Sequence, residues 1–123
     1  MHKTLLCTAV CLLAVAYQGT SQAADVEAGK KAFNKCAVCH SPEQGVTRVG
    51  PSLFGVIGRK AGTLPGYNFS TAMKDYGVTW SPETLNTYLA APMQEVKGTK
   101  MTFAGVKDET ERANIIAYLA TLK

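Results

Sequence analysis

The segment Cys36-Ala37-Val38-Cys39-His40 constrains this chain more than any other stretch of its sequence. Two cysteines three residues apart, with a histidine directly after the second, are typical of covalent haem attachment. Each thiol can add across one vinyl group of haem, and the neighbouring imidazole can then ligate the iron. The segment therefore predicts one haem c bound through two thioethers, at Cys36 and Cys39, with His40 as an axial ligand of its iron.

The first 23 residues have the layout of a secretory signal peptide. A positive start at Met1 to Lys3 precedes an apolar run from Leu5 to Ala16, and Ser21-Gln22-Ala23 offers a cleavage site between small residues. The apolar run is shorter than the ~20 residues that a membrane-spanning helix needs. We therefore expect a cleaved signal peptide over residues 1–23 and no stable membrane insertion after its removal. Cleavage after Ala24 is the alternative.

The mature chain, residues 24–123, keeps two of the four cysteines and one of the two histidines. These cysteines do not complete a zinc site, which would need two further ligands. A disulfide between Cys36 and Cys39 would close only a very small loop. A thioredoxin-like redox pair would require a strand–helix–strand context, which the sequence lacks. Haem attachment is therefore the interpretation that the cysteine count favours.

The size and charge of the mature chain restrict its partners. A single small domain has a modest core, to which a haem would add a large apolar surface. Loss of Lys3 with the signal peptide lowers the formal net charge from +4 to +3. This mild excess is not the charge density of a nucleic-acid binder, so no nucleic-acid partner is expected. It suits docking to acidic faces of other proteins.

The two ends of the mature chain are predicted to form helices that cross. The first helix should begin at Asp25 as N-cap and run toward Cys36. The last should begin at Asp108, which has a glutamate three residues on in a variant of the capping box. One face of the first helix carries Val26, Gly29, Phe33 and Cys36 at helical spacing. We expect Gly29 to allow a close crossing, with Gly29 and Phe33 packed against Ile115 and Tyr118.

Between these ends the pattern predicts one further main helix and one short helix. Ser81-Pro82-Glu83 is a strong helix start, and Pro92 should end that helix. Its apolar face is formed by Leu85, Tyr88 and Leu89. A shorter helix is predicted from Ser70 to Tyr76, ended by Gly77. The glycine- and proline-rich stretch 41–66 should wrap over the haem. The predicted fold class is thus all-α, with three main helices, short helices and loops around one cofactor.

The iron's second axial position must take a methionine, a lysine, a small molecule or nothing, because His40 is the only histidine of the mature chain. Met73 lies within the predicted short helix, where core packing explains it. Met93 follows Pro92 at a helix end. Met101 lies in a non-periodic segment with charged neighbours. The backbone of such a loop can place the methionine sulfur where the iron needs a ligand. The pattern favours Met101, with Met93 as the alternative.

Several motifs in the same order make the chain similar to the class I cytochromes c, close to mitochondrial cytochrome c and the short bacterial cytochrome c2. The resemblance covers nearly the whole mature chain and implies the cytochrome c fold for residues 24–123. The matching segments are Cys36 to His40, Val49 to Lys60, Gly77 to Trp80, Gly98 to Gly105 and Ile116 to Leu119. These separate matches are far more specific than the haem motif alone.

The resemblance implies a role for several residues. It makes Met101 the second axial ligand of the iron, with Phe103 shielding the haem edge. It makes the carbonyl of Pro51 the acceptor for the other ring nitrogen of His40, which would fix the imidazole. Tyr88 is implied to lie near the Met101 sulfur. The residues implied at the haem propionates are Arg59, Trp80 and Thr99.

The chain also departs from the mitochondrial pattern. Lys97 stands where mitochondrial relatives usually carry proline, which predicts a less rigid Met101 loop. Phe69 stands where a tyrosine often donates to a propionate. Three positions that carry docking lysines in mitochondrial proteins hold Met93, Gln94 and Asp108 here. The lysines that remain around the exposed haem edge are Lys35, Lys97, Lys100 and Lys107. An acidic partner is expected, with weaker charge matching than in mitochondria.

The resemblance and the ligand set together predict a soluble one-electron carrier and not an enzyme. We expect a monomer in the periplasm that serves the respiratory chain or a dehydrogenase. Its expected partners are redox proteins with acidic docking faces, namely a bc-type complex, an oxidase or a periplasmic dehydrogenase. The alternative is a peroxidase-like or gas-binding haem protein with a labile distal ligand. That function would need an open axial position and a distal acid or base, and no second histidine remains to supply one.

Overall fold

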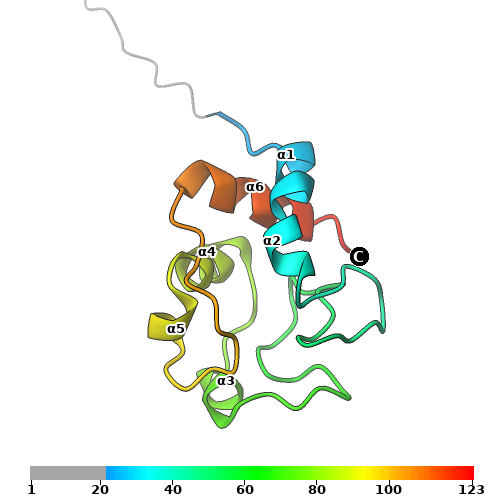
Figure 1. Cartoon of the computed structure of the whole chain (residues 1–123), viewed down its shortest axis with the longest axis vertical. Helices are drawn as coiled ribbons and strands as arrows, with labels where there is room; N and C mark the ends of the chain where they lie inside the picture. The colour runs from blue at the N-terminus through cyan, green and yellow to red at the C-terminus, as the bar shows by residue number, and fades with distance from the viewer. Residues whose placement is uncertain (1–21) are drawn as a thin grey trace, which may run out of the picture.

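The structure, a computed structural model, describes residues 22–123 (Figure 1). The predicted signal peptide, residues 1–23, lies outside the described residues except for its last two positions. The described part of the chain consists of helices and loops, and its one β-type pairing is an isolated antiparallel bridge between Lys60 and Thr79. No helix within residues 22–123 has the length and apolar character needed to cross a membrane.

The N-terminal helix begins where the sequence predicts, but it is interrupted. Helix α1 spans Val26–Ala32, and the Asp25 side chain caps it by accepting hydrogen bonds from two backbone amides. The chain turns at Phe33 and continues as the short helix α2, Asn34–Ala37. Val26, at the start of the predicted apolar face, is 37% exposed. Gly29 and Phe33 of that face are buried.

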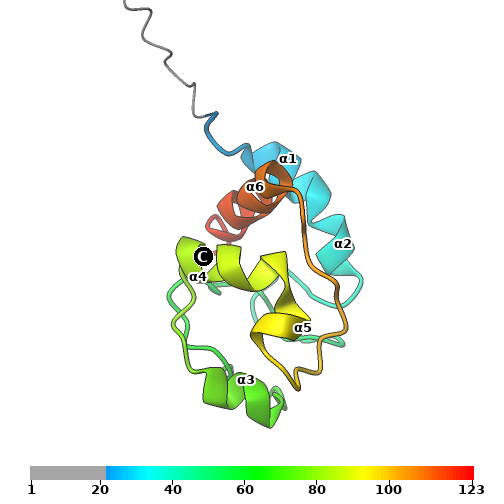
Figure 2. The same cartoon turned by 90° about the vertical axis from the view of Figure 1, so that its left-hand side faces the viewer.

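The predicted crossing of the terminal helices is confirmed. Helix α6 spans Glu109–Leu119, and the Asp108 side chain accepts a 2.7 Å hydrogen bond from the Glu111 amide at its start. Figures 1 and 2 both show α1 lying across α6. The rings of Phe33 and Tyr118 meet edge to face at 5.2 Å between centroids. Each short helix would be marginal alone, so this contact stabilises both.

Three further helices lie between the terminal pair. Helix α3 spans Thr71–Tyr76, is capped by Ser70 and ends at Gly77, whose φ of 59° is left-handed. Helix α4 spans Pro82–Ala90 and is capped by Ser81. Pro92 ends the α4 segment as predicted, but it also begins a one-turn helix, α5, Pro92–Glu95. Residues 41–66, predicted as a loop, contain no helix.

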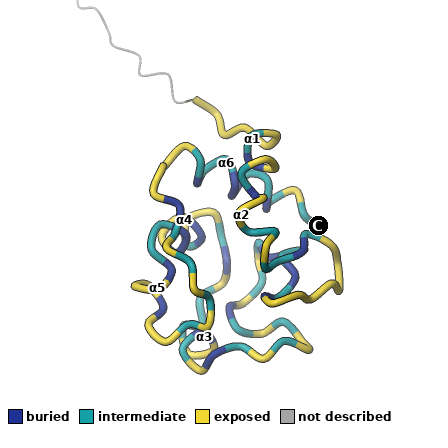
Figure 3. The backbone as a smooth tube through the Cα atoms, viewed as in Figure 1, coloured by how far each residue is buried: buried dark blue, intermediate teal, exposed yellow. Residues whose placement is uncertain are grey.

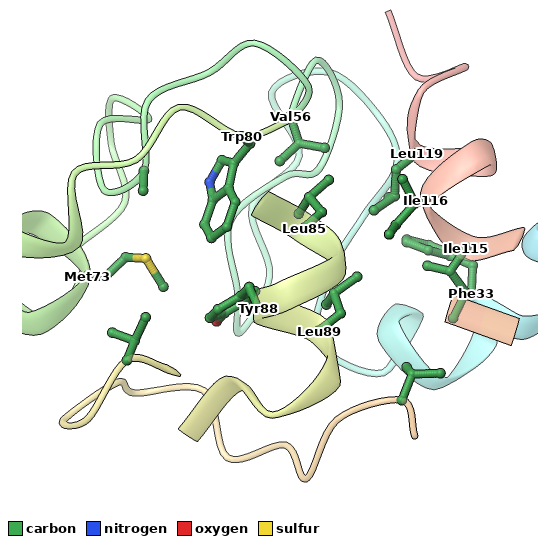
Figure 4. Close-up of a cluster of buried hydrophobic side chains, with 13 residues drawn as sticks. Phe33, Val56, Met73, Trp80, Leu85, Tyr88, Leu89, Ile115, Ile116 and Leu119 are labelled. Atoms are coloured by element: carbon green, nitrogen blue, oxygen red, sulfur yellow. The ribbon is translucent and has the colours of Figure 1, made fainter. Parts of the chain in front are cut away.

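The core lies between α4, the terminal helices and the loops that surround them (Figures 3 and 4). The predicted apolar face of α4 is buried at all three positions, and Trp80 and Val56 from neighbouring loops pack with it. The core side chains labelled in Figure 4 are Phe33, Val56, Met73, Trp80, Leu85, Tyr88, Leu89, Ile115, Ile116 and Leu119. A single core therefore supports both the crossing helices and the loop that carries Met101.

Candidate haem site

The haem-attachment motif lies at the C-terminal end of α2. The amides of Cys39 and His40 both donate to the carbonyl of Cys36, at 3.0 and 2.9 Å. These bonds form one tight turn, so the two thiols and the imidazole leave the backbone within a single turn. Cys36 and Cys39 form no disulfide with each other. Burial raises the pKa of the Cys36 thiol, although the Lys35 charge opposes this. The turn therefore presents both sulfurs from one short segment, as two thioether bonds to one haem require.

The imidazole of His40 is held by its neighbours in a form that can ligate a metal. Its Nδ1 lies 2.7 Å from the carbonyl oxygen of Pro51, so Nδ1 carries the proton and Nε2 keeps its lone pair. Burial lowers the pKa of His40, and the Arg59 charge acts in the same direction while the Pro51 hydrogen bond opposes it. The imidazole is thus neutral at pH 7, which is the ligating state.

Gly50 supports the same ring and was not singled out from the sequence as a site residue. A Cβ at this position would lie only 2.7 Å from Nδ1 of His40, so the ring rests directly on the Gly50 backbone. The amide of Gly50 also donates a 2.8 Å hydrogen bond to the carbonyl of Cys39. Its place directly before Pro51, whose carbonyl binds the ring, is the sequence signal that could have identified it.

Met101 is presented by the loop between α5 and α6. Its sulfur lies 3.8 Å from the hydroxyl of Tyr88, and its amide donates a 3.2 Å hydrogen bond to Oγ1 of Thr99. His40 and Met101 lie near each other in the fold. The other two candidates sit differently: Met73 is buried in the core, and Met93 is 45% exposed on α5.

Tyr88 is positioned to donate a hydrogen bond to the Met101 sulfur. It is buried on α4, and its ring packs against Trp80 at 4.9 Å between centroids. Burial raises its pKa to about 12, although the Thr99 hydroxyl opposes that shift. The phenol is therefore protonated at neutral pH and its proton can face the thioether.

The other residues implied by the resemblance lie in two connected loop segments. The Arg59 guanidinium is half-buried and donates to the carbonyls of Ser52 and Phe54, at 2.9 and 3.4 Å. The amide of Trp80 donates a 2.9 Å hydrogen bond to the carbonyl of Arg59, which joins the two segments. Burial lowers the pKa of Arg59. Arg59 is thus a structural cation of the loop rather than a freely solvated charge.

Three of the four lysines expected around the haem edge make hydrogen bonds within the protein. Lys35 pairs with Glu111 of α6 at 2.6 Å. Lys100 donates to the carbonyl of Asn68 at 2.7 Å, and Lys107 donates to the carbonyl of Ala90 at 2.6 Å. Within residues 22–123 no such bond is found for Lys97. The positive charges remain at the surface, but most of them are fixed in place.

The donor set fits a covalently bound haem. Two cysteine sulfurs come from the same turn as a neutral imidazole whose free nitrogen is Nε2, and a hydrogen-bonded thioether comes from a separate loop. Nitrogen and thioether ligands of this kind suit a low-spin haem iron. Among residues 22–123 no cluster of three or more histidine, cysteine or acidic side chains offers a metal site of another type.

Comparison with known proteins agrees with this site. The family described as Cytochrome c matches residues 26–123. The cytochrome c of Euglena viridis is 49% identical over 100 residues, covering 80% of this chain and 98% of the relative. The cytochrome c2 of Rhodoblastus acidophilus is 49% identical over 102 residues, covering 82% and 95%. The solved structure of cytochrome cH from Methylobacterium extorquens superposes with a TM-score of 0.74 at 47% identity, covering 79% of this chain and 98% of that chain.

These matches extend over both the attachment motif and the Met101 loop, and the helices agree with the fold that the motifs predicted. The chain therefore belongs to the cytochrome c family of haem-based electron carriers, and its cofactor is a covalent c-type haem with iron.

Proposed function

We propose that the chain is a one-electron carrier whose haem iron is ligated by His40 and Met101. When bound, the haem supplies an iron centre that alternates between Fe(II) and Fe(III). The observation that carries the proposal is the pair of hydrogen bonds on the two ligand side chains. Pro51 fixes the ring of His40, and Tyr88 approaches the sulfur of Met101. Both side chains are thus oriented by residues from other segments, which is typical of built ligand positions.

The proposed ligands favour a high reduction potential. A thioether is a soft ligand that stabilises the reduced iron. The apolar side chains of the core, with Tyr88 beside Met101, disfavour the extra positive charge of the oxidised form. In this proposal the side chains of Arg59, Trp80 and Thr99 bind the haem propionates. The half-buried guanidinium of Arg59 supports this, because it is a positive charge held in place by backbone carbonyls and would pair with a carboxylate.

The proposal also makes the chain a carrier and not an enzyme. With His40 and Met101 on the iron, a small molecule must displace Met101 before it reaches the metal. The hydrogen bonds of Tyr88 and Thr99 to Met101 oppose that displacement. Electron transfer needs only an exposed haem edge and a docking face, whereas peroxidase-like chemistry needs an open position and an acid or base.

We propose further that the chain works as a monomer in the periplasm after removal of residues 1–23. The arrangement of charge, apolar run and small residues in that segment supports export. The surface lysines near the Met101 loop support acidic redox partners, of which a bc-type complex, an oxidase or a periplasmic dehydrogenase of the respiratory chain are the candidates.

Two measurements test the cofactor and its ligands. The mature protein should weigh one haem more than its peptide, and acid–acetone should not extract the haem. Met101→Ala should abolish the weak far-red iron–sulfur absorption of the oxidised protein, whereas Met93→Ala should leave it unchanged. A haem-free mass would overturn the covalent attachment. Loss of the band in Met93→Ala, with retention in Met101→Ala, would reassign the ligand to Met93.

A further inference from the structure

The segment that ends in Met101 is joined to the α3 segment by a series of contacts. Tyr76 at the end of α3 donates a 2.9 Å hydrogen bond to Oε1 of Glu95 at the end of α5. A Cβ on Gly98 would lie 3.3 Å from the Cβ of Ala72. Lys100 donates to the carbonyl of Asn68. The contacts run antiparallel, since positions 76, 72 and 68 meet positions 95, 98 and 100 in turn. Figures 1 and 2 both show the loop after α5 passing beside α3.

In the Tyr76–Glu95 contact, the Tyr76 side chain packs against core aromatic rings and also bonds to the Met101 segment. The ring of Tyr76 lies 5.9 Å from that of Trp80 and 6.4 Å from that of Tyr88, between centroids. Both of those rings are buried. The hydroxyl of Tyr76 is therefore held in position by the packing of its ring, and its hydrogen bond restrains the position of Glu95.

Beyond Glu95, Val96 is buried in the core, and the backbone hydrogen bonds that follow are local. The amide of Val96 bonds back to Pro92 and the amide of Thr99 to Val96, both within the same segment. Lys97 is exposed and stands where the mitochondrial pattern has proline, so the backbone is not stiffened there. A displacement of α5 would therefore pass along the segment to Met101, six residues beyond Glu95.

We propose that the Tyr76–Glu95 hydrogen bond is a clasp that sets how readily Met101 leaves the iron. Tyr76 is then a positioning residue, which acts on the ligand through Glu95 and α5. The inference rests on the proposed function, in which Met101 is the axial ligand. The raised pKa of Tyr76, about 12, agrees with a phenol that stays a donor throughout the neutral range.

The clasp can be measured by competition for the iron. Imidazole binds ferric haem only where Met101 has left, so its apparent affinity reports the population of the open loop. Tyr76→Phe keeps the ring and removes the hydroxyl, and it should raise the affinity for imidazole about three- to tenfold. A tenfold change corresponds to ~1.4 kcal/mol. Glu95→Ala should have the same effect, and Glu95→Gln, which keeps an acceptor oxygen, should restore most of the wild-type affinity.

Tyr67→Phe is the matched control. The Tyr67 hydroxyl donates a 3.1 Å hydrogen bond to the carbonyl of Val49, which does not involve the Met101 segment. This variant should bind imidazole as the wild type does. The double variant Tyr76→Phe with Glu95→Ala should match either single variant, because both remove one bond. Hydrogen exchange at the amides of Val96 and Thr99 should quicken in Tyr76→Phe.

The outcomes separate the role of the Tyr76–Glu95 bond from the assignment of Met101 as ligand. Suppose that Met101→Ala loses the far-red absorption but Tyr76→Phe binds imidazole within twofold of the wild type. The role of the Tyr76–Glu95 bond is then wrong, and the assignment of Met101 as ligand stands. The role of the bond is also wrong if the two single variants add in the double variant, since they would then act independently. If Met101→Ala keeps the far-red absorption, the ligand assignment is wrong and the clasp falls with it.

Discussion

Gly29 of α1 passes so close to Asn114 of α6 that a side chain on Gly29 would collide with the Asn114 carbonyl oxygen. The side chain of Asn114 also accepts a 2.7 Å hydrogen bond from the amide of Asp25. One residue of α6 therefore meets α1 both at its cap and at its second turn. This crossing fixes the segment that continues into the haem-attachment turn.

Gly29→Ala should destabilise the protein, although alanine is the better helix former by up to ~1 kcal/mol. The added methyl group must push the α6 backbone away, and overpacking of this kind costs about 2 kcal/mol or more. Denaturant unfolding of the oxidised protein measures the change. Lys30→Ala, an exposed substitution in the same helix, is the control and should stay within about 0.5 kcal/mol. An increase in stability for Gly29→Ala would contradict the close crossing.

Arg112 is a buried cation of α6 that joins three parts of the fold. Its Nε donates a 2.7 Å hydrogen bond to Oδ1 of Asn86 on α4, and its Nη1 donates a 2.9 Å hydrogen bond to the carbonyl of Val106. Val106 lies in the last part of the loop that carries Met101, shortly before α6. No buried side-chain nitrogen or oxygen within residues 22–123 lacks a partner. Arg112 thus anchors the far end of the Met101 loop.

Arg112→Leu should lower the free energy of unfolding by about 2–4 kcal/mol, because it leaves the buried carbonyl of Val106 without this donor and removes the bond to Asn86. Thermal and denaturant melts measure the loss. Arg48→Leu is a matched control, since the exposed Arg48 makes a single 3.2 Å bond to the carbonyl of Ala37. It should cost less than about 1 kcal/mol. Equal losses in the two variants would show that the burial of Arg112 adds nothing.

Local signals in the sequence predicted the helix starts. Asp25, Ser70, Ser81 and Asp108 each cap the helix expected at that place, because a cap depends on residues only two or three positions away. The break at Phe33 was missed, since α1 and α2 share one helical pattern. The short helix α5 was missed as well, because a proline both ends one helix and begins the next.

Long-range contacts were not accessible to the same reasoning. Arg112 reads as an exposed charge on an amphipathic helix, and only the fold brings Asn86 and Val106 to it. Tyr76 and Glu95 are separated by 19 positions, with no motif that links them. The hydrogen bond between His40 and Pro51 was expected only from the family resemblance. Spacing identified the attachment motif, and the non-periodic, charged segment around Met101 favoured that methionine, but neither signal supplied the neighbours of these residues.

Tyr76 should titrate late, and its titration should lower stability at high pH. Burial raises its pKa to about 12, and the hydrogen bond to Glu95 and the negative charge of Glu95 act in the same direction. The unfolded chain releases this proton near pH 10. Between pH 10 and about 12 the folded state binds more protons than the unfolded state, so the free energy of unfolding falls as pH rises.

Ultraviolet titration of phenolate absorption tests this prediction. Tyr76→Phe should remove one late-titrating tyrosine and reduce the loss of stability above pH 10. In Glu95→Gln the pKa of Tyr76 should move down toward 10, because the carboxylate charge is gone. Tyr88 remains as a second late group, since burial raises its pKa to about 12 as well. An unchanged titration curve in Glu95→Gln would show that Glu95 does not act on Tyr76.

Lys97 should contribute more than a remote lysine to the attraction of anionic reaction partners. It is exposed beside the Met101 loop, whereas Lys35, Lys100 and Lys107 are tied to protein acceptors. Lys97→Glu should slow oxidation of the reduced protein by ferricyanide about two- to tenfold at low ionic strength. At ~1 M salt the difference should disappear, because screening then acts within about 3 Å.

Stopped-flow kinetics measure this effect, and Lys123→Glu is the control. Lys123 is exposed beyond α6, outside the Met101 loop, and its reversal makes the same change in net charge. Its effect on the rate should be smaller than that of Lys97→Glu. Equal slowing by the two variants would mean that net charge alone governs the encounter. A larger effect at Lys97 would place electron transfer to ferricyanide on the side of the molecule where the Met101 loop meets solvent, since a local field acts only where the reagent approaches.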